Sequence, residues 1–385
     1  MPISFLCFAV AAVPQYHHRS CSPQYRRFAS VFDANNQHIL GLTKSKELAV
    51  WDAKTGETIR VLKGNIDPIV RARLTADGMS VLGQSLNHQS DWSTWGTPKD
   101  RGRERAIRLW DIGTGKIRWT IIDGIFDAFS RDQRRIYGVS SRFAPHLTKP
   151  KLVSWDANTG RQTFSFPAFA PASILSNRAQ ESADGKRLLY SDVTGTRIFE
   201  LKSRTQIHFA DDKSTGIVVA PAAFTESGER FFFAGPMGTG MIDLISIRTG
   251  TMVNRAVFPN RESPSRVGWL TKSEGFVAYA NGSWYSFRRS SGLVKHTQDS
   301  EGGYDLIVSP DERSFITWAI KYDRNNEAFR TSGFDTRTCK KRWERPGVPI
   351  VCLPDAQLII EDEDMVRFVD IRTGIEKRSV KRAVR

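Results

Sequence analysis

Cysteine and histidine are scarce in this chain of 385 residues, which has four of the former and seven of the latter. The cysteines form no CxxC pair and show no repeated spacing, which argues against a zinc site and against a disulfide framework. The sequence therefore predicts no metal site and no bound cofactor. A chain of this length buries enough core to fold without either.

Catalytic and nucleotide-binding motifs are also missing. The chain contains no GxSxG, HExxH, P-loop or GxGxxG, which removes the nucleophile-elbow, zincin and nucleotide signatures. Its acidic runs, Asp211–Asp212 and Glu361–Asp364, are short and typical of solvated edges. We therefore expect no catalytic residues and a protein that is not an enzyme.

Long apolar stretches and helical patterns are absent as well. No segment repeats apolar residues at helical spacing over about 12 positions. The run Ile3–Val13 is too short to span a bilayer, and no Lys or Arg precedes it as a signal peptide requires. Residues 1–25 are expected to be an irregular segment, a weak signal-like stretch, an added strand or the product of a misplaced start codon. A cytoplasmic location is favoured, with export as the alternative if residues 1–13 act as a signal peptide.

A short motif recurs along the chain. WDAKTG begins at Trp51, WDIGTG at Trp110 and WDANTG at Trp155. Five degraded copies follow, led by Phe199, Ile245, Phe287, Phe334 and Val369. The eight leading residues are separated by 35 to 59 positions, and most intervals lie near the roughly 40–45 residues of a four-stranded propeller blade.

A second turn, rich in Asp, Gly and Ser, precedes each copy and is followed by a run of branched and aromatic residues typical of strands. The first copy thus predicts strands at Phe28–Phe32, His38–Leu42, Glu47–Trp51 and Thr58–Leu62. The fold class is therefore all-β, a propeller of about eight four-stranded blades with little helix. Residues 26–385 are expected to form one propeller domain. The alternative has seven blades, with the weak copy at Phe199 forming an elaborated connection.

The repeated WDxxTG resembles the end of the third strand in WD-repeat propellers. DIGTGKIRW, which ends at Trp119, is similar to the DxxTGxxxW repeats of quinoprotein-like propellers. The resemblance covers the chain from about Phe28 onward, although the Gly-His pair of WD repeats is missing. Its enzyme members imply an alternative function, a quinoprotein-like oxidoreductase or hydrolase with a site in a central channel. The adjacent cysteines typical of quinoprotein dehydrogenases are not found here.

The connection between the second and third strands varies in length. It spans 32 residues from Gly78 to Trp110, and 22 in the third and seventh units, against 12 to 17 elsewhere. In the seventh unit the loop is expected around Tyr322–Asn326. Insertions on one face of a repeat protein often mark its binding side. Because Trp and Arg are enriched at binding hot spots, the longest insertion carries the candidate partner surface. Its residues are Trp92, Trp95, Arg101, Arg103 and Arg105.

The chain is basic, with 56 Lys and Arg against 41 Asp and Glu, a formal net charge of +15. Such an excess suits solubility and also nucleic acid or another polyanion. No block of five or six consecutive basic residues occurs, so this partner class is possible but not favoured. The sequence therefore predicts a non-catalytic platform for an unidentified protein partner.

Overall fold

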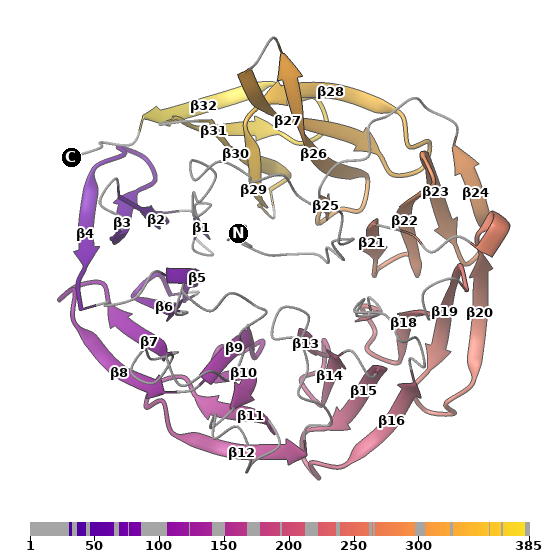
Figure 1. Cartoon of the computed structure of the whole chain (residues 1–385), viewed down its shortest axis with the longest axis horizontal. Coiled ribbons are helices and arrows are strands. Elements are labelled where there is room, and N and C mark those ends of the chain that lie inside the picture. Colours follow the sequence, from indigo (N-terminus) through magenta and orange to yellow (C-terminus); the bar gives the residue numbers. More distant parts are fainter. Residues whose placement is uncertain are drawn as a thin grey trace. The chain divides into compact units, whose positions relative to one another are not determined.

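The computed structural model confirms an all-β chain made of eight four-stranded antiparallel sheets, the blades of a β-propeller. Each sheet consists of four consecutive strands, here called a to d in chain order (Figure 1). The structure describes residues 31–32, 37–43, 47–64, 69–75, 77–85, 106–122, 124–140, 151–167, 178–192, 195–211, 222–235, 239–261, 264, 266–296, 305–323, 326–353, 355–362 and 365–381.

The first four blades follow the repeat. Blade 1 contains β1 (Val31–Phe32), β2 (His38–Leu42), β3 (Leu48–Asp52) and β4 (Thr58–Leu62). Blade 2 contains β5 (Ile69–Leu74), β6 (Ser80–Ser85), β7 (Ala106–Asp111) and β8 (Ile117–Ile122). Blade 3 contains β9 (Gly124–Phe129), β10 (Arg135–Ser140), β11 (Lys151–Asp156) and β12 (Gln162–Pro167). Blade 4 contains β13 (Arg178–Glu181), β14 (Arg187–Asp192), β15 (Gly195–Glu200) and β16 (Gln206–Asp211).

The last four blades do the same. Blade 5 contains β17 (Ala222–Phe224), β18 (Arg230–Ala234), β19 (Met241–Ser246) and β20 (Met252–Val257). Blade 6 contains β21 (Arg266–Leu270), β22 (Gly275–Ala280), β23 (Ser283–Arg288) and β24 (Gly292–His296). Blade 7 contains β25 (Asp305–Val308), β26 (Ser314–Asp323), β27 (Asn326–Asp335) and β28 (Lys341–Pro346). Blade 8 contains β29 (Val348–Cys352), β30 (Gln357–Asp362), β31 (Met365–Asp370) and β32 (Glu376–Lys381).

The strand positions predicted from the first repeat are close to those observed. The b and d strands coincide with the prediction, and the c strand is shifted by one residue, to Leu48–Asp52. Of the predicted a strand, Val31–Phe32 is a strand and the rest lies outside the described residues. The seven-bladed alternative is wrong, because Phe199 lies in β15 at the third position of a complete blade. In the described ranges the one helical element is η4 (Pro259–Arg261).

The core lies between neighbouring blades. Every residue of β6 is buried, as is every residue of β7 before Asp111, so both faces of the sheet are covered. One cluster joins Leu109 of blade 2 to Phe126 and Trp155 of blade 3. Another joins Phe232 of blade 5 to Phe276 of blade 6. Covering on both faces explains why inner strands such as β6 and β7 are continuously buried, whereas the outer strand β8 alternates between half-buried and exposed residues.

Contacts along the chain define two compact units, one with blades 1–3 and the other with blades 4–8, except that Val380 and Lys381 group with the first. Within each unit the a and d strands form the two edges of each sheet. The a strands of some neighbouring blades, such as β1 and β5 or β21 and β25, contact each other (Figure 1). Among the described residues, no helix has the length and apolar character needed to cross a membrane.

Candidate interaction surfaces

The repeated DxxTG builds the turn between strands c and d. In blade 2, Asp111 Oδ1 accepts hydrogen bonds from the backbone N–H of Thr114 at 2.7 Å and from its hydroxyl at 2.8 Å. These bonds hold the pKa of the Asp111 carboxyl below its ordinary value. The same aspartate–threonine pairing recurs in blades 3, 7 and 8. The motif residues therefore form a local turn, and their spacing follows from its geometry.

The residue after that threonine, or its equivalent, has a left-handed backbone in all eight blades, with φ between 51° and 76°. Glycine occupies this position in six blades, since it adopts positive φ at little cost. Arg204 in blade 4 and Cys339 in blade 7 occupy it in the other two. These two degraded copies thus keep the turn although they have lost the glycine that suits it best.

The turn between strands a and b has its own recurring bond. A serine or threonine hydroxyl donates to the aspartate two residues later, at 2.5 to 2.7 Å in blades 2, 3, 4 and 7. The same oxygen accepts the backbone N–H that opens strand b, as in Arg135 N–H to Ser130 Oγ at 2.9 Å. These turns lie at the same end of each sheet as the c–d turns, which we call the turn face.

Side chains of strand d fasten neighbouring blades at this end. The Trp119 indole donates to the Ala157 carbonyl at 3.1 Å and lies so close to Gly160 that an added Cβ would be 2.9 Å from its ring. Trp343 repeats both contacts, with the Ile371 carbonyl at 3.0 Å and with Gly374. In blade 1, Arg60 occupies this position instead and donates to two carbonyls of the next c–d turn. The repeated residues are thus occupied in holding the blades together.

The opposite end of each sheet carries the b–c connections, and with them the predicted site. Trp92, Trp95, Arg101, Arg103 and Arg105 lie outside the described residues, so their role stays a prediction. The structure does describe where the insertion starts and ends. Ser85 and Ala106 are paired in the β6–β7 ladder, and both are fully buried. Arg108, also buried, donates to Ser85 Oγ at 3.0 Å and braces this point.

The other two long b–c connections differ from each other. In blade 3 the ladder ends at the pair Ser140 and Lys151, and residues 141–150 between them lie outside the described part. In blade 7 the expected loop around Tyr322–Asn326 is instead a continuation of the sheet, in which β26 and β27 pair as far as Asp323 and Asn326. Ring contact between Trp318 and Phe329, with centroids 5.7 Å apart, supports this extended hairpin.

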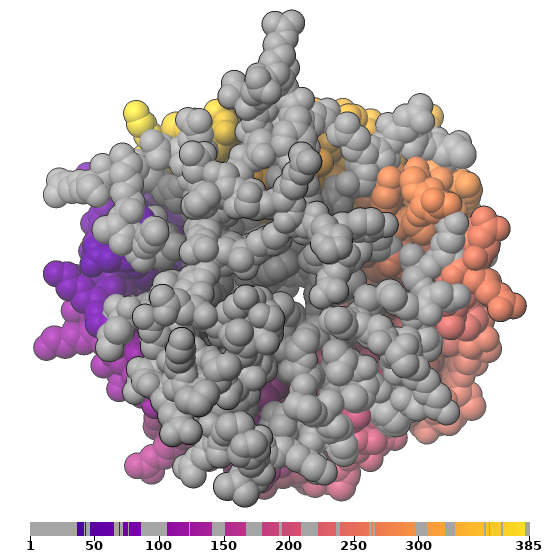
Figure 2. Space-filling view, viewed as in Figure 1, coloured from indigo at the N-terminus to yellow at the C-terminus, as the bar shows by residue number. Residues whose placement is uncertain are grey.

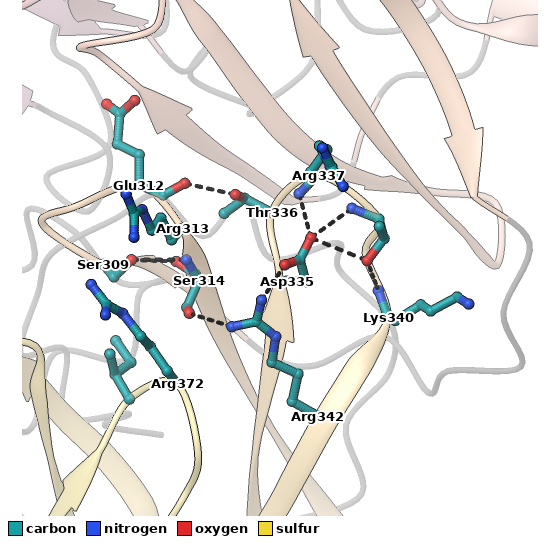
Figure 3. A network of polar contacts seen from close by, with 12 residues as sticks. Ser309, Glu312, Arg313, Ser314, Asp335, Thr336, Arg337, Lys340, Arg342 and Arg372 are labelled. Carbon is teal, nitrogen blue, oxygen red and sulfur yellow. Dashed lines mark hydrogen bonds and ion pairs between the residues drawn. The ribbon is translucent and has the colours of Figure 1, made fainter.

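The turn face of blades 7 and 8 holds a dense polar network whose residues are not among those predicted from the sequence (Figure 3). The Asp335 carboxylate accepts from the c–d turn through one oxygen and pairs with Arg342 through the other. Arg372 of blade 8 pairs with Asp311 of blade 7 at 2.5 Å. Burial alone would raise the pKa of Asp311, but hydrogen bonds from Ser309 and Arg372 lower it to about 2. In the sequence, the basic run Lys340–Arg342 is the signal that could have indicated this surface.

Cys339 and Cys352 are the cysteines of the described residues. Burial raises the pKa of the Cys339 thiol to about 12 and also raises that of Cys352, so neither sulfur is a ready thiolate nucleophile. Within the described ranges no three His, Cys, Asp or Glu side chains gather to hold a metal ion.

Exposed large apolar side chains lie mostly on the d strands, which are sheet edges. β20 carries three of them, Met252, Val253 and Val257. Figure 2 shows this part of the chain at the surface in salmon and orange.

No protein-family model matches the chain, and no curated protein has a matching sequence.

Proposed function

We propose that this protein is a non-catalytic platform that binds a protein partner through its b–c connections, chiefly through the insertion between β6 and β7. The pairing of Ser85 with Ala106 is the observation that supports this most strongly. Because the ladder is paired and buried as far as Ser85 and Ala106, we infer that the strands do not depend on residues 86–105 for their register. The ordering cost of such a loop grows slowly with its length, so the fold tolerates it without gaining from it.

The composition of the insertion supports the same function. Two tryptophans and three arginines in one loop are the residue types that dominate binding hot spots. The turn face, in contrast, uses its repeated residues in bonds within and between blades. We further propose a relationship to quinoprotein-like propellers, supported by Trp119 and Trp343, which pack on the glycine of the next blade's turn.

The proposal is tested by replacing residues 86–105 with Asn-Gly, a pair suited to a two-residue hairpin between Ser85 and Ala106. We expect the variant to keep the melting temperature of the full chain. In quantitative affinity capture, the amount of co-captured partner protein should fall at least tenfold. Loss of one hot-spot residue costs about 2 kcal/mol of binding free energy, which corresponds to more than tenfold in affinity.

A second variant, Trp92→Ala with Trp95→Ala, keeps the loop and removes its aromatic side chains. It should reproduce the loss of capture at an unchanged melting temperature. Unfolding of both variants would show that the tryptophans are structural. Unchanged capture by both would place the partner surface elsewhere.

A further inference from the structure

The turns of blade 7 carry more positive charge than their carboxylates can neutralise. Asp311 pairs with Arg372, and Asp335 with Arg342. Glu312 is committed to the neighbouring blade, where it accepts the backbone N–H groups of Lys272 at 2.6 Å and Ser273 at 3.0 Å. Every carboxylate of these two turns therefore already has a donor.

Lys341 pairs with Glu344 at 3.0 Å, which leaves three cations. Arg313, Arg337 and Lys340 are exposed, and their turn hydrogen bonds run through backbone atoms, leaving the charged ends to the solvent. Two bonds hold the turns together, from the Thr336 N–H to the Arg313 carbonyl at 3.2 Å and from the Thr336 hydroxyl to the Glu312 carbonyl at 2.6 Å. Arg313 and Arg337 are thus displayed from two turns fixed against each other (Figure 3).

The chemistry of this surface favours an anion with several charges. Arginine presents a planar fork of donors that suits phosphate. Neither turn, 309–314 or 335–342, contains an exposed large apolar side chain. Cys339 in the second turn is buried, and so is Trp343, which follows it. Protein partners dock on desolvated apolar or aromatic anchors, whereas phosphodiester backbones bind by charge and counterion release. A nucleic-acid backbone fits these residues better than an acidic protein.

We propose that Arg313, Arg337 and Lys340 on the turn face of blade 7 bind the phosphodiester backbone of duplex nucleic acid without reading its sequence. The net charge of +15 supports the encounter over a longer range. This surface is at the opposite end of its sheet from the b–c connections, so it does not depend on the proposed protein-binding site.

The test measures binding of the full chain to a mixed-sequence 20-base-pair DNA duplex by fluorescence anisotropy between 50 and 200 mM NaCl. The variant Arg313→Ala/Arg337→Ala/Lys340→Ala should weaken binding at least tenfold at 100 mM. Since each phosphate contact contributes about 0.9 to the slope of log affinity against log salt, the slope should fall by roughly 2 to 3. The matched control, Lys54→Ala/Lys116→Ala/Arg161→Ala, removes equal charge from c–d turns of blades 1–3 and should weaken binding less than threefold.

The proposal is overturned if the full chain does not bind the duplex, or if both triple variants weaken binding equally. It is also overturned if poly-glutamate binds as tightly as DNA with the same dependence on the three residues, which would identify an acidic protein as the ligand. Should the alanine variant melt at a lower temperature, glutamine at the same positions removes the charge and keeps the length of the side chains.

Discussion

At the scale of the residue, the left-handed position of the c–d turn is the most exacting. Arg204 holds φ at 60° where six other blades have glycine. A residue with a Cβ in this conformation costs about 1–2 kcal/mol, and the exposed Arg204 side chain offsets little of it.

We therefore expect Arg204→Gly to raise the free energy of unfolding by about 1 kcal/mol. Gly250→Ala is the mirror experiment, because its added Cβ meets nothing nearer than 3.9 Å and only the backbone strain changes. It should lower stability by a similar amount. Urea titrations measure both. A shift of the two variants in the same direction would contradict the account of this turn.

Residues whose role is local were the ones that the sequence predicted well. Asp111 and Thr114 form their turn through contacts three residues apart, so the motif alone indicates it. Glu312 could not be read in this way, because its partners Lys272 and Ser273 are distant in sequence and adjacent only after the blades pack. The binding role of Trp92 and its neighbours in the insertion remains a prediction.

At the scale of the element, we expect the contact between one blade's d strand and the next blade's turn to contribute to the stability of the fold. Trp119 contributes ring packing on Gly160 and one hydrogen bond to the Ala157 carbonyl. These two contributions can be separated by substitution.

Trp119→Phe keeps much of the packing and removes the hydrogen bond, for an expected loss of about 1 kcal/mol. Trp119→Ala removes both and should cost about 3 kcal/mol. Chemical denaturation followed by the remaining tryptophan fluorescence gives both values. Equal losses in the two variants would mean that the indole packing contributes nothing.

Blade 7 shows where strand prediction fails at this scale. The length of the connection, 22 residues from Glu312 to Phe334, predicts a loop around Tyr322–Asn326. This segment pairs as a hairpin because β26 and β27 are already aligned by the ladder below it, from Ser314 and Asp335 onward. Tertiary context thus overrides a weak local preference.

At the scale of the whole molecule, the turn aspartates couple stability to pH. Hydrogen bonds from Thr159 lower the pKa of Asp156, and those from Ser130 and Arg134 lower the pKa of Asp132. A carboxyl whose pKa is lower in the folded chain stabilises it above the unfolded value of about 4, and that contribution is lost as the pH falls toward the folded pKa.

Circular dichroism should therefore show cooperative loss of structure as the pH falls from 4 toward 2. The double variant Asp111→Asn/Asp156→Asn keeps the acceptor oxygens without titrating. It should be less stable at pH 7, and its stability should change less between pH 4 and 2. An identical pH dependence in both proteins would show that the turn aspartates do not drive acid unfolding.

The central claim is that the two ends of the sheets have different roles: residues of the turn face hold the blades together, and the b–c connections bind the protein partner. It is tested most directly by placing a photo-crosslinking phenylalanine analogue at position 95 in one protein and at position 158 in another. Asn158 is exposed in the c–d turn of blade 3, in the same unit as blade 2, which makes it a matched control. The account predicts a discrete protein adduct from position 95 and none from position 158. The same adduct from position 158, with none from position 95, would contradict it.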